Sequence, residues 1–145
     1  MSAQFQYTRL AYQAQAVNSV FEVFADVRFV PPQGVHANPT YVPHEAQNAI
    51  KANIERIRAD NGIKTGVVDV PHTPTPGLSL DVLMETGTGK TFTFIETIHR
   101  LRQKYGLSKF IVLVPSNAIR QGTVKTLQTT ADFFSKEYSN QKINV

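Results

Sequence analysis

The stretch that decides the predicted fold is Leu80-Asp81-Val82-Leu83-Met84-Glu85-Thr86-Gly87-Thr88-Gly89-Lys90-Thr91. An apolar run from Leu78 to Met84 is typical of a strand, and a Gly-Thr-Gly turn follows it. After the turn, the spacing of Phe94, Ile98 and Leu101 predicts a helix with these three side chains on one face. Strand, glycine turn, Lys-Thr and helix in this order form the context that a phosphate-binding P-loop requires.

Each residue type in this turn suits the binding of a nucleotide phosphate. Gly87 and Gly89 can adopt a positive φ and have no Cβ, so the backbone can wrap closely around an anion. The successive N–H groups and the positive end of the following helix would then point at the β-phosphate. Lys90 would place its charge near the β- and γ-phosphates, and the Thr91 hydroxyl would join the coordination shell of Mg²⁺.

The motif has the shortened form G-x-G-K-T, because Met84 stands where the full pattern has its first glycine. The alternative interpretation is an ordinary glycine turn between a strand and a helix, with Lys90 merely solvated. The apolar run before the turn and the helical pattern after it favour the phosphate site.

Length and composition are those of one globular domain. The 145 residues are 41% hydrophobic and 18% charged. No apolar run approaches the roughly 20 residues of a membrane span, and the N-terminus lacks the basic start and apolar core of a secretory signal. The absence of cysteine excludes disulfides and thiolate metal sites. We therefore expect a cytoplasmic protein with no membrane partner.

The net charge of +4 lies in one half of the chain. Residues 1–77 carry six Lys or Arg and six Asp or Glu, whereas residues 78–145 carry nine and five. A basic surface on the half with the glycine turn suits a nucleotide and also a nucleic acid. Part of this excess serves only to keep the protein in solution.

The sequence divides into three parts, two before the glycine turn and one that contains it. Residues 1–26 predict an N-terminal helix from Thr8 to Phe24, with Thr8 as its N-cap. Residues 27–77 predict a proline-rich insertion with one helix, from Glu45 to Asp60.

Residues 78–138 predict the core of the fold. The apolar run Phe110 to Val114 is typical of a parallel strand that is covered on both faces. Together with the first strand and the intervening helix it would form a βαβ unit with a right-handed crossover, and a long helix follows. The predicted fold class is therefore α/β, a parallel sheet with flanking helices.

Two residues at the start of the last helix are candidates for binding nucleic acid. Ser116 is its natural N-cap, and Arg120 lies in its first turns. Basic and hydroxyl groups at a helix N-terminus can hold a nucleic-acid phosphate, but a capped surface helix has the same pattern. The residues alone leave both interpretations open, and they favour an exposed helical position for Gln13.

A P-loop hydrolase also needs an Asp on a second strand to hold Mg²⁺ and a group that orients the attacking water. The acidic residues after Lys90 are Glu96, Asp132 and Glu137, and all three lie in helical patterns. We therefore expect this chain by itself to bind nucleotide poorly or modestly and to hydrolyse essentially none. This pattern is typical of one part of a larger protein.

Met84 to Thr91 resembles motif I of superfamily 2 helicases, and Val114 to Thr123 resembles their motif Ia region. More narrowly, the form Met-Glu-Thr-Gly-Thr-Gly-Lys-Thr, followed by Lys109 to Val112 and by Pro115 to Arg120, resembles the restriction subunit of type III restriction-modification enzymes. The likeness extends from Leu10 to about Tyr138 and covers only the N-terminal fraction of such a subunit.

The resemblance implies that residues 1–145 are the N-terminal part of the first of two RecA-like ATPase domains, which a nuclease domain follows. It implies ATP and Mg²⁺ as cofactors, and DNA and a modification methyltransferase subunit as partners. The implied activity is ATP-dependent communication along DNA followed by double-strand cleavage. Motif II, the later helicase motifs and the nuclease are absent from these residues.

The resemblance also implies roles for single residues. Gln13 matches the glutamine that such helicases place against adenine, and Ser116 and Arg120 match the region along the DNA backbone. The matches to the triphosphate loop are Thr86, Gly87, Thr88, Gly89, Lys90 and Thr91. No catalytic residue besides Lys90 is assigned.

Three alternatives stay open. One is another superfamily 2 DNA helicase, and another is a non-catalytic remnant that binds nucleotide or DNA. The third is a small nucleotide kinase, which would need an arginine-bearing lid after the second strand, and the sequence shows none.

Overall fold

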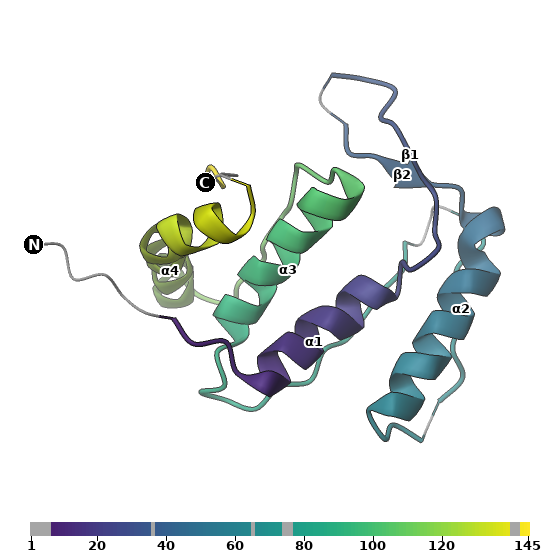
Figure 1. Cartoon of the computed structure of the whole chain (residues 1–145), viewed down its shortest axis with the longest axis horizontal. Coiled ribbons are helices and arrows are strands. Elements are labelled where there is room, and N and C mark those ends of the chain that lie inside the picture. Colours follow the sequence, from purple (N-terminus) through teal and green to yellow (C-terminus); the bar gives the residue numbers. More distant parts are fainter. Residues whose placement is uncertain (1–6, 36, 65, 74–76, 140–142) are drawn as a thin grey trace, which may run out of the picture.

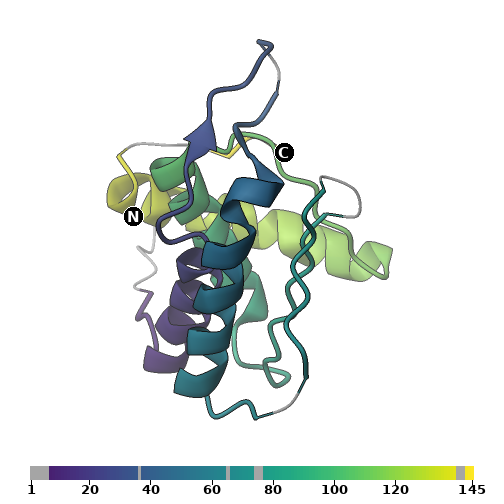
Figure 2. The same cartoon turned by 90° about the vertical axis from the view of Figure 1, so that its right-hand side faces the viewer.

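The computed structural model describes residues 7–35, 37–64, 66–73, 77–139 and 143–145. In this part of the chain it has four helices and one two-stranded antiparallel sheet. The helices stand in the order α4, α3, α1 and α2 across the molecule, so that α3 packs on both α1 and α4 (Figure 1). The α4 helix lies across the direction of α1 and α2 (Figure 2).

The N-terminal helix α1, Ala11–Glu22, begins later than the sequence predicted. Its N-cap is Leu10, whose backbone N–H donates to Gln13 Oε1 at 3.1 Å. The prediction of Thr8 as the cap is therefore wrong, because the helix begins after Leu10, and Gln13 at the third helical position accepts the N–H of that N-cap residue. Within α1, Val17 is fully buried.

The segment between α1 and the glycine turn holds a hairpin as well as the predicted helix. Strand β1, Phe29–Val30, pairs antiparallel with β2, Thr40–Tyr41. Helix α2, Pro43–Asp60, starts two residues before the predicted position, because proline suits the first turn of a helix. The core around α2 consists of Val23, Val27, Ala46, Ile50, Val68 and Val70.

The two helices that follow the glycine turn are those that the sequence predicted. Helix α3, Lys90–Tyr105, ends at Gly106, whose φ of +72° is the left-handed conformation that glycine adopts at such ends. Helix α4, Asn117–Glu137, is capped by Ser116, whose Oγ accepts the N–H of Ile119 at 3.3 Å. Ile95 of α3 packs with Phe134 and Tyr138 in a second buried cluster.

The predicted parallel sheet and βαβ unit are not formed by the described residues. Residues 78–84 and 110–114 have no regular secondary structure, and the described sheet contains only β1 and β2. A strand is stabilised by hydrogen bonds to a neighbouring strand, and apolar composition does not supply that neighbour. The sequence therefore located the apolar runs, but their predicted pairing in a parallel sheet is not confirmed by the described residues.

Each run packs on one side only. Leu78 and Leu80 contact the core around α2, and Phe110 and Val112 lie beside α3 and α4. Leu83 is 100% exposed, and Ile111 and Leu113 are each 90% exposed. The teal trace in Figure 2 shows the chain before α3 running along one side of the helices. The far side of the run 110–114 is thus an uncovered apolar surface, whereas Leu83 shares the far side of the first run with Ser79 and Asp81.

Among the described residues, no helix combines the length and the apolar composition that crossing a bilayer requires.

Candidate functional site

The glycine turn is a closed loop that leads directly into α3. Gly87 has a φ of +82° and Gly89 a φ of +84°. Residues that have a Cβ rarely adopt such positive φ values. The hydroxyl of Thr88 donates to the carbonyl of Glu85 at 2.6 Å, which closes the loop on itself. Both glycines therefore take the conformation that the sequence analysis required of them.

The Lys90 side chain folds back over the start of this loop. Its Nζ donates to the carbonyl oxygens of Met84 at 2.9 Å and of Glu85 at 2.7 Å. An ammonium group has three N–H donors, so these two bonds leave one for another acceptor. The lysine is exposed, but its charge is held at the mouth of the loop.

The start of α3 adds a positive potential to the same place. Gly89 is the N-cap of this helix, and the helix has no acidic residue in its first turn. The first N–H groups of a helix have no partner within the helix, and the helix dipole makes this end positive. Thr91, in the first turn, is half-buried. An anion is the ligand that suits such an end.

Gln13 of α1 contacts the glycine loop. Its Nε2 donates to the carbonyl oxygen of Thr88 at 3.0 Å, and only 7% of the residue is exposed. A Cβ on Gly89 would come too close to Gln13 Nε2, so the glycine is needed for this approach as well as for its φ. The interpretation of Gln13 as an exposed helical residue, based on the residues alone, is therefore wrong. The signal that selected it was the family resemblance.

Ser116 and Arg120 lie on a different element from the loop. Both are exposed at the N-terminal end of α4. Arg120 lines a cavity of 430 Å³, whose other walls come from α3, Ser108, the run 110–114, α4 and residues 143–145. Among the described residues, none of the glycine loop lines this cavity. The structure thus brings Gln13 and residues 86–91 together and leaves these two residues apart from them.

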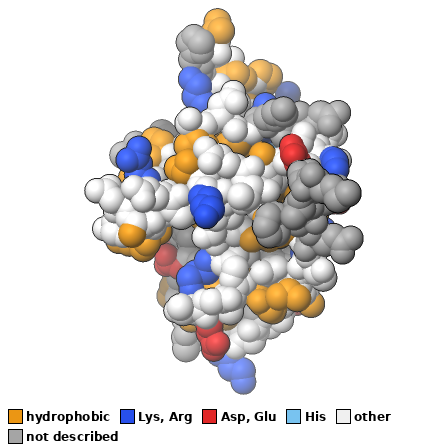
Figure 3. All heavy atoms as spheres, turned by 90° about the vertical axis from the view of Figure 1, so that its left-hand side faces the viewer, with side chains coloured by type: hydrophobic (Ala, Val, Ile, Leu, Met, Phe, Trp, Pro, Cys, Tyr) orange, Lys and Arg blue, Asp and Glu red, His pale blue; other side chains and the backbone are white. Residues whose placement is uncertain are grey.

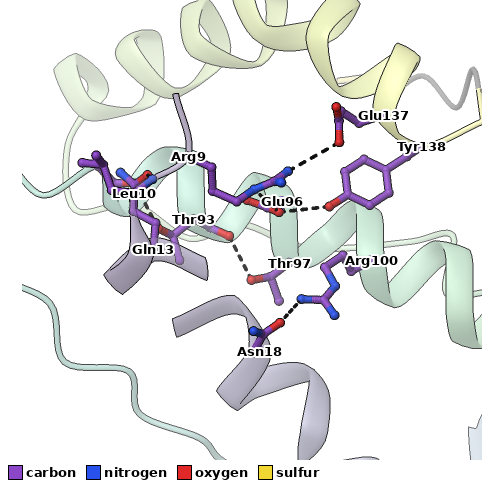
Figure 4. A network of polar contacts seen from close by, with 11 residues as sticks. Arg9, Leu10, Gln13, Asn18, Thr93, Glu96, Thr97, Arg100, Glu137 and Tyr138 are labelled. Atoms are coloured by element: carbon purple, nitrogen blue, oxygen red, sulfur yellow. Dashed lines mark hydrogen bonds and ion pairs between the residues drawn. The ribbon is translucent and has the colours of Figure 1, made fainter. Parts of the chain in front are cut away.

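Sequence reasoning missed a buried polar network next to this site. Glu96 of α3 is 3% exposed, and its Oε1 lies 2.8 Å from Arg9 Nε. Tyr138, at the end of α4, donates its hydroxyl to the same Oε1 at 3.0 Å. Arg9 also approaches Glu137 Oε2 at 3.8 Å. Figure 4 shows Arg9 reaching from the segment before α1 between these groups of α3 and α4.

The network shifts the pKa values of Tyr138 and Arg9. Burial, followed by the charge and the hydrogen bond of Glu96, raises the pKa of Tyr138 to about 12. Burial lowers the pKa of Arg9, but its hydrogen bond and charge interaction with Glu96 outweigh this and raise the pKa above its ordinary value. No sequence signal could have found the pair, because Arg9 and Glu96 lie far apart in the chain.

His99 lies one turn after Glu96 and is 3% exposed. Its ring stacks on Phe134 at 5.0 Å and on Tyr138 at 5.4 Å between centroids. Burial and then the positive charge of Arg102 lower the pKa of His99. Within the described structure, His99 Nδ1 and Glu96 Oε2 are buried without a hydrogen-bond partner. The neutral imidazole is the form that this environment favours.

Carboxylate ligands for a metal ion are not gathered near the loop. The described residues include no group of three or more His, Cys, Asp or Glu side chains that could hold a metal ion. Glu96 is paired with Arg9, and Asp132 and Glu137 lie in α4. Thr91, the predicted Mg²⁺ ligand, lies in the first turn of α3.

Comparison with known proteins gives one consistent family. The model of the type III restriction enzyme Res subunit matches residues 6–145. The chain is 35% identical over 138 residues to the type III restriction-modification enzyme EcoP15I Res subunit of Escherichia coli, covering 91% of this chain and 14% of that protein. It is 32% identical over 148 residues to the EcoPI Res subunit of Escherichia phage P1, covering 97% of this chain and 15% of that protein.

A third relative, the StyLTI Res subunit of Salmonella typhimurium, is 41% identical over 71 residues, which is 46% of this chain and 7% of that protein. The chain thus spans about one seventh of the length of the first two relatives. Because the family model covers nearly the whole chain, the chain belongs to the family of type III restriction enzyme Res subunits.

Proposed function

We propose that this chain is the ATP-binding N-terminal part of the first RecA-like domain of a type III restriction endonuclease subunit. The observation that carries the proposal is the contact between Gln13 and the glycine loop, at which Lys90 and the start of α3 also meet. The complete subunit would be a DNA-dependent ATPase and translocase that cleaves DNA together with a modification methyltransferase subunit. Such an enzyme acts on DNA in the cytoplasm.

The loop and Lys90 would hold the triphosphate. Backbone N–H groups of residues 86–91 would surround the β-phosphate, and the positive end of α3 would add to their attraction. The ammonium of Lys90, bonded to two carbonyl oxygens, would use its third N–H to bind a phosphate oxygen. Thr91 would supply a hydroxyl ligand to Mg²⁺, which screens the charge of the phosphates.

Gln13 has the donors and acceptors that recognition of adenine requires. A primary amide has two acceptor lone pairs and two N–H donors. Oε1 accepts one hydrogen bond, from Leu10, and Nε2 donates one, to Thr88. One acceptor and one donor therefore remain, and they match the N6 amino group and the N7 atom of adenine. Guanine, with an oxygen at the corresponding position, does not match this pair.

DNA would lie along the start of α4. Ser116 and Arg120 are exposed there, and a hydroxyl and a guanidinium group suit contact with backbone phosphates. On the face of the molecule that contains α4, Lys and Arg side chains stand separately and do not form one continuous patch (Figure 3). This arrangement supports a few phosphate contacts that do not depend on sequence.

Binding and orienting the nucleotide are the tasks that these residues could perform. The acidic side chains after Lys90 are occupied in a buried ion pair or lie in α4, so we expect the 145-residue chain alone not to turn ATP over. Membership of the Res family removes the small nucleotide kinase from the alternatives.

Calorimetric titration with Mg-ATP tests the proposed site. We expect weak binding by the wild-type chain and no detectable binding by Lys90→Ala. Lys104→Ala is a matched control, because it removes the same charge from the last turn of the same helix. Equal binding by wild type and Lys90→Ala would remove the assignment of the loop.

A further inference from the structure

The ion pair between Arg9 and Glu96 fixes the part of the chain that holds the Gln13 amide. Arg9 immediately precedes Leu10, whose N–H donates to Gln13 Oε1. That N–H belongs to the planar peptide unit between Arg9 and Leu10, so a rotation of this unit would break the bond to Gln13. The side chain on one end of the peptide unit is held by Glu96 at 2.8 Å.

The anchor for this segment is rigid. Glu96 lies within α3, and its Oε1 is shared between Arg9 and the hydroxyl of Tyr138. Tyr7, two residues before Arg9, also packs on these helices. Its ring centroid lies 5.7 Å from that of Phe92 in α3 and 5.5 Å from that of Phe133 in α4. The segment before α1 is therefore held against both α3 and α4.

The same helix carries the other half of the nucleotide site. Lys90 is the first residue of α3, and Glu96 lies six residues later, about 9 Å along the helix axis. A rigid helix thus presents the triphosphate end of the site and, through Arg9, the peptide unit that orients Gln13. Gln13 itself bonds to Thr88, one residue before the N-cap of α3. The route from Glu96 to the base-reading amide consists of bonds that are all present in the structure (Figure 4).

We propose that Arg9 and Glu96 are positioning residues of the nucleotide site, whose ion pair sets the Gln13 amide for adenine and so determines the preference for ATP. This inference rests on the proposed function, because it requires a nucleotide at the loop. It assigns a role to the buried carboxylate of Glu96, which pairs with Arg9 and accepts the hydroxyl of Tyr138. Both would act through Gln13, to which Arg9 is linked by the peptide unit of Leu10.

The test compares binding of three probes, Mg-ATP, Mg-GTP and Mg-tripolyphosphate, by the same protein. Tripolyphosphate reports on the loop alone, and the ratio of ATP to GTP affinity reports on Gln13. Gln13→Ala should lower this ratio by about 5- to 100-fold, the range of one bidentate base contact. Arg9→Met should lower it by about three- to tenfold and leave the tripolyphosphate affinity within twofold.

Three further variants separate positioning from general stability. Glu96→Gln should lower the ratio of ATP to GTP affinity as Arg9→Met does. It replaces Arg9→Met in the test if that variant does not fold. Arg9→Lys keeps the charge and should restore most of the ratio. Asn18→Ala removes another polar link between α1 and α3, the bond to Arg100, and should leave the ratio unchanged because it lies away from Gln13. The double variant Arg9→Met/Gln13→Ala should have the same ratio of ATP to GTP affinity as Gln13→Ala alone.

The possible failures are distinguishable. If Arg9→Met and Glu96→Gln keep the wild-type ratio while Gln13→Ala loses it, the positioning role is wrong and the proposed function stands. If Asn18→Ala lowers the ratio equally, the effect belongs to the packing of α1 on α3 and the positioning role is again overturned. If the wild-type chain binds none of the three probes, the proposed function fails, and the inference fails with it.

Discussion

Gln13 Nε2 lies 3.0 Å from the carbonyl oxygen of Thr88, although 75 residues separate them in the chain. The contact joins the first turn of α1 to the loop that precedes α3, and these two helices pack directly on each other. It also explains a requirement for glycine that φ alone does not impose, since a side chain at position 89 would displace Gln13.

Gly89→Ala and Gly87→Ala form a matched pair that measures this contact. Both positions have φ above +80°, so each substitution should cost about 1–2 kcal/mol of unfolding free energy through backbone strain. A Cβ on Gly87 meets nothing within 4 Å, whereas a Cβ on Gly89 meets the Gln13 amide. Urea unfolding should therefore show the larger loss for Gly89→Ala.

The excess loss should disappear when Gln13 is shortened. In a Gln13→Ala background, Gly89→Ala and Gly87→Ala should destabilise the protein equally, because the clashing amide is gone. Equal losses in the wild-type background would show that Gln13 does not approach the loop as the structure has it.

The sequence predicted the helices better than the strands, and the reason is physical. The ends of α3 and α4 are fixed by local signals, a left-handed Gly106 and the Ser116 cap, which are visible in the chain. A strand is fixed by its neighbour, so the apolar runs at 78–84 and 110–114 could be found but not paired. The start of α1 was misplaced because its N-cap is Leu10, an apolar residue whose N–H is satisfied by Gln13, three residues later.

In the candidate site too, local features could be predicted from the sequence and contacts between distant residues could not. The loop could be predicted from residues 86–91, because its glycines and Lys90 are contiguous. The approach of Gln13 and the pairing of Arg9 with Glu96 could not be predicted from the residues alone, because each joins positions at least 75 residues apart. Such contacts depend on how α1 and α3 pack, and spacing within one helix carries no information about that.

Removing Arg9 should destabilise the chain more than removing both charges of its pair. Arg9→Met leaves the carboxylate of Glu96, which is 4% exposed, with only the Tyr138 hydroxyl to satisfy it. The loss should fall toward the lower end of about 3–5 kcal/mol, because the Arg9 side chain is 33% exposed and part of the attraction is screened. Arg9→Met/Glu96→Gln should recover part of this loss in urea unfolding, and a double variant less stable than Arg9→Met would contradict the pairing.

The stability of the protein should depend on the protonation of His99. Burial lowers the pKa of His99 in the folded state, so the unfolded state binds more protons as the pH falls below the ordinary value near 6.5. The contribution of this group to stability is therefore fully present above that value and is lost as the pH falls through the folded pKa. His99→Phe keeps a ring between Phe134 and Tyr138 and should remove this loss.

Unfolding free energies of wild type and His99→Phe, measured from pH 7.5 to pH 5, check the assignment. The difference between the two proteins should change in favour of the variant as the pH falls. A difference that stays constant across this range would show that His99 is not the group responsible.

The uncovered side of the run 110–114 should tolerate polar residues. Ile111 and Leu113 are each 90% exposed, so Ile111→Thr and Leu113→Thr should change the unfolding free energy by only about 0.5 kcal/mol. Val112 lies between them and lines the cavity beside α3 and α4, so Val112→Thr should cost more. Light scattering against protein concentration should also fall in the Ile111 and Leu113 variants, because an exposed apolar surface is removed.

Arg120 should contribute to DNA affinity through a phosphate and not through a base. Arg120→Ala should weaken binding of duplexes of different sequence to the same extent and should reduce the slope of log affinity against log salt by about 1. Lys136→Ala is the control, because it removes one positive charge from the last turn of the same helix and leaves the start of α4 intact. Fluorescence anisotropy at several salt concentrations measures both quantities. If the two variants behave alike, the DNA affinity reflects net charge only, and the start of α4 is a capped surface helix.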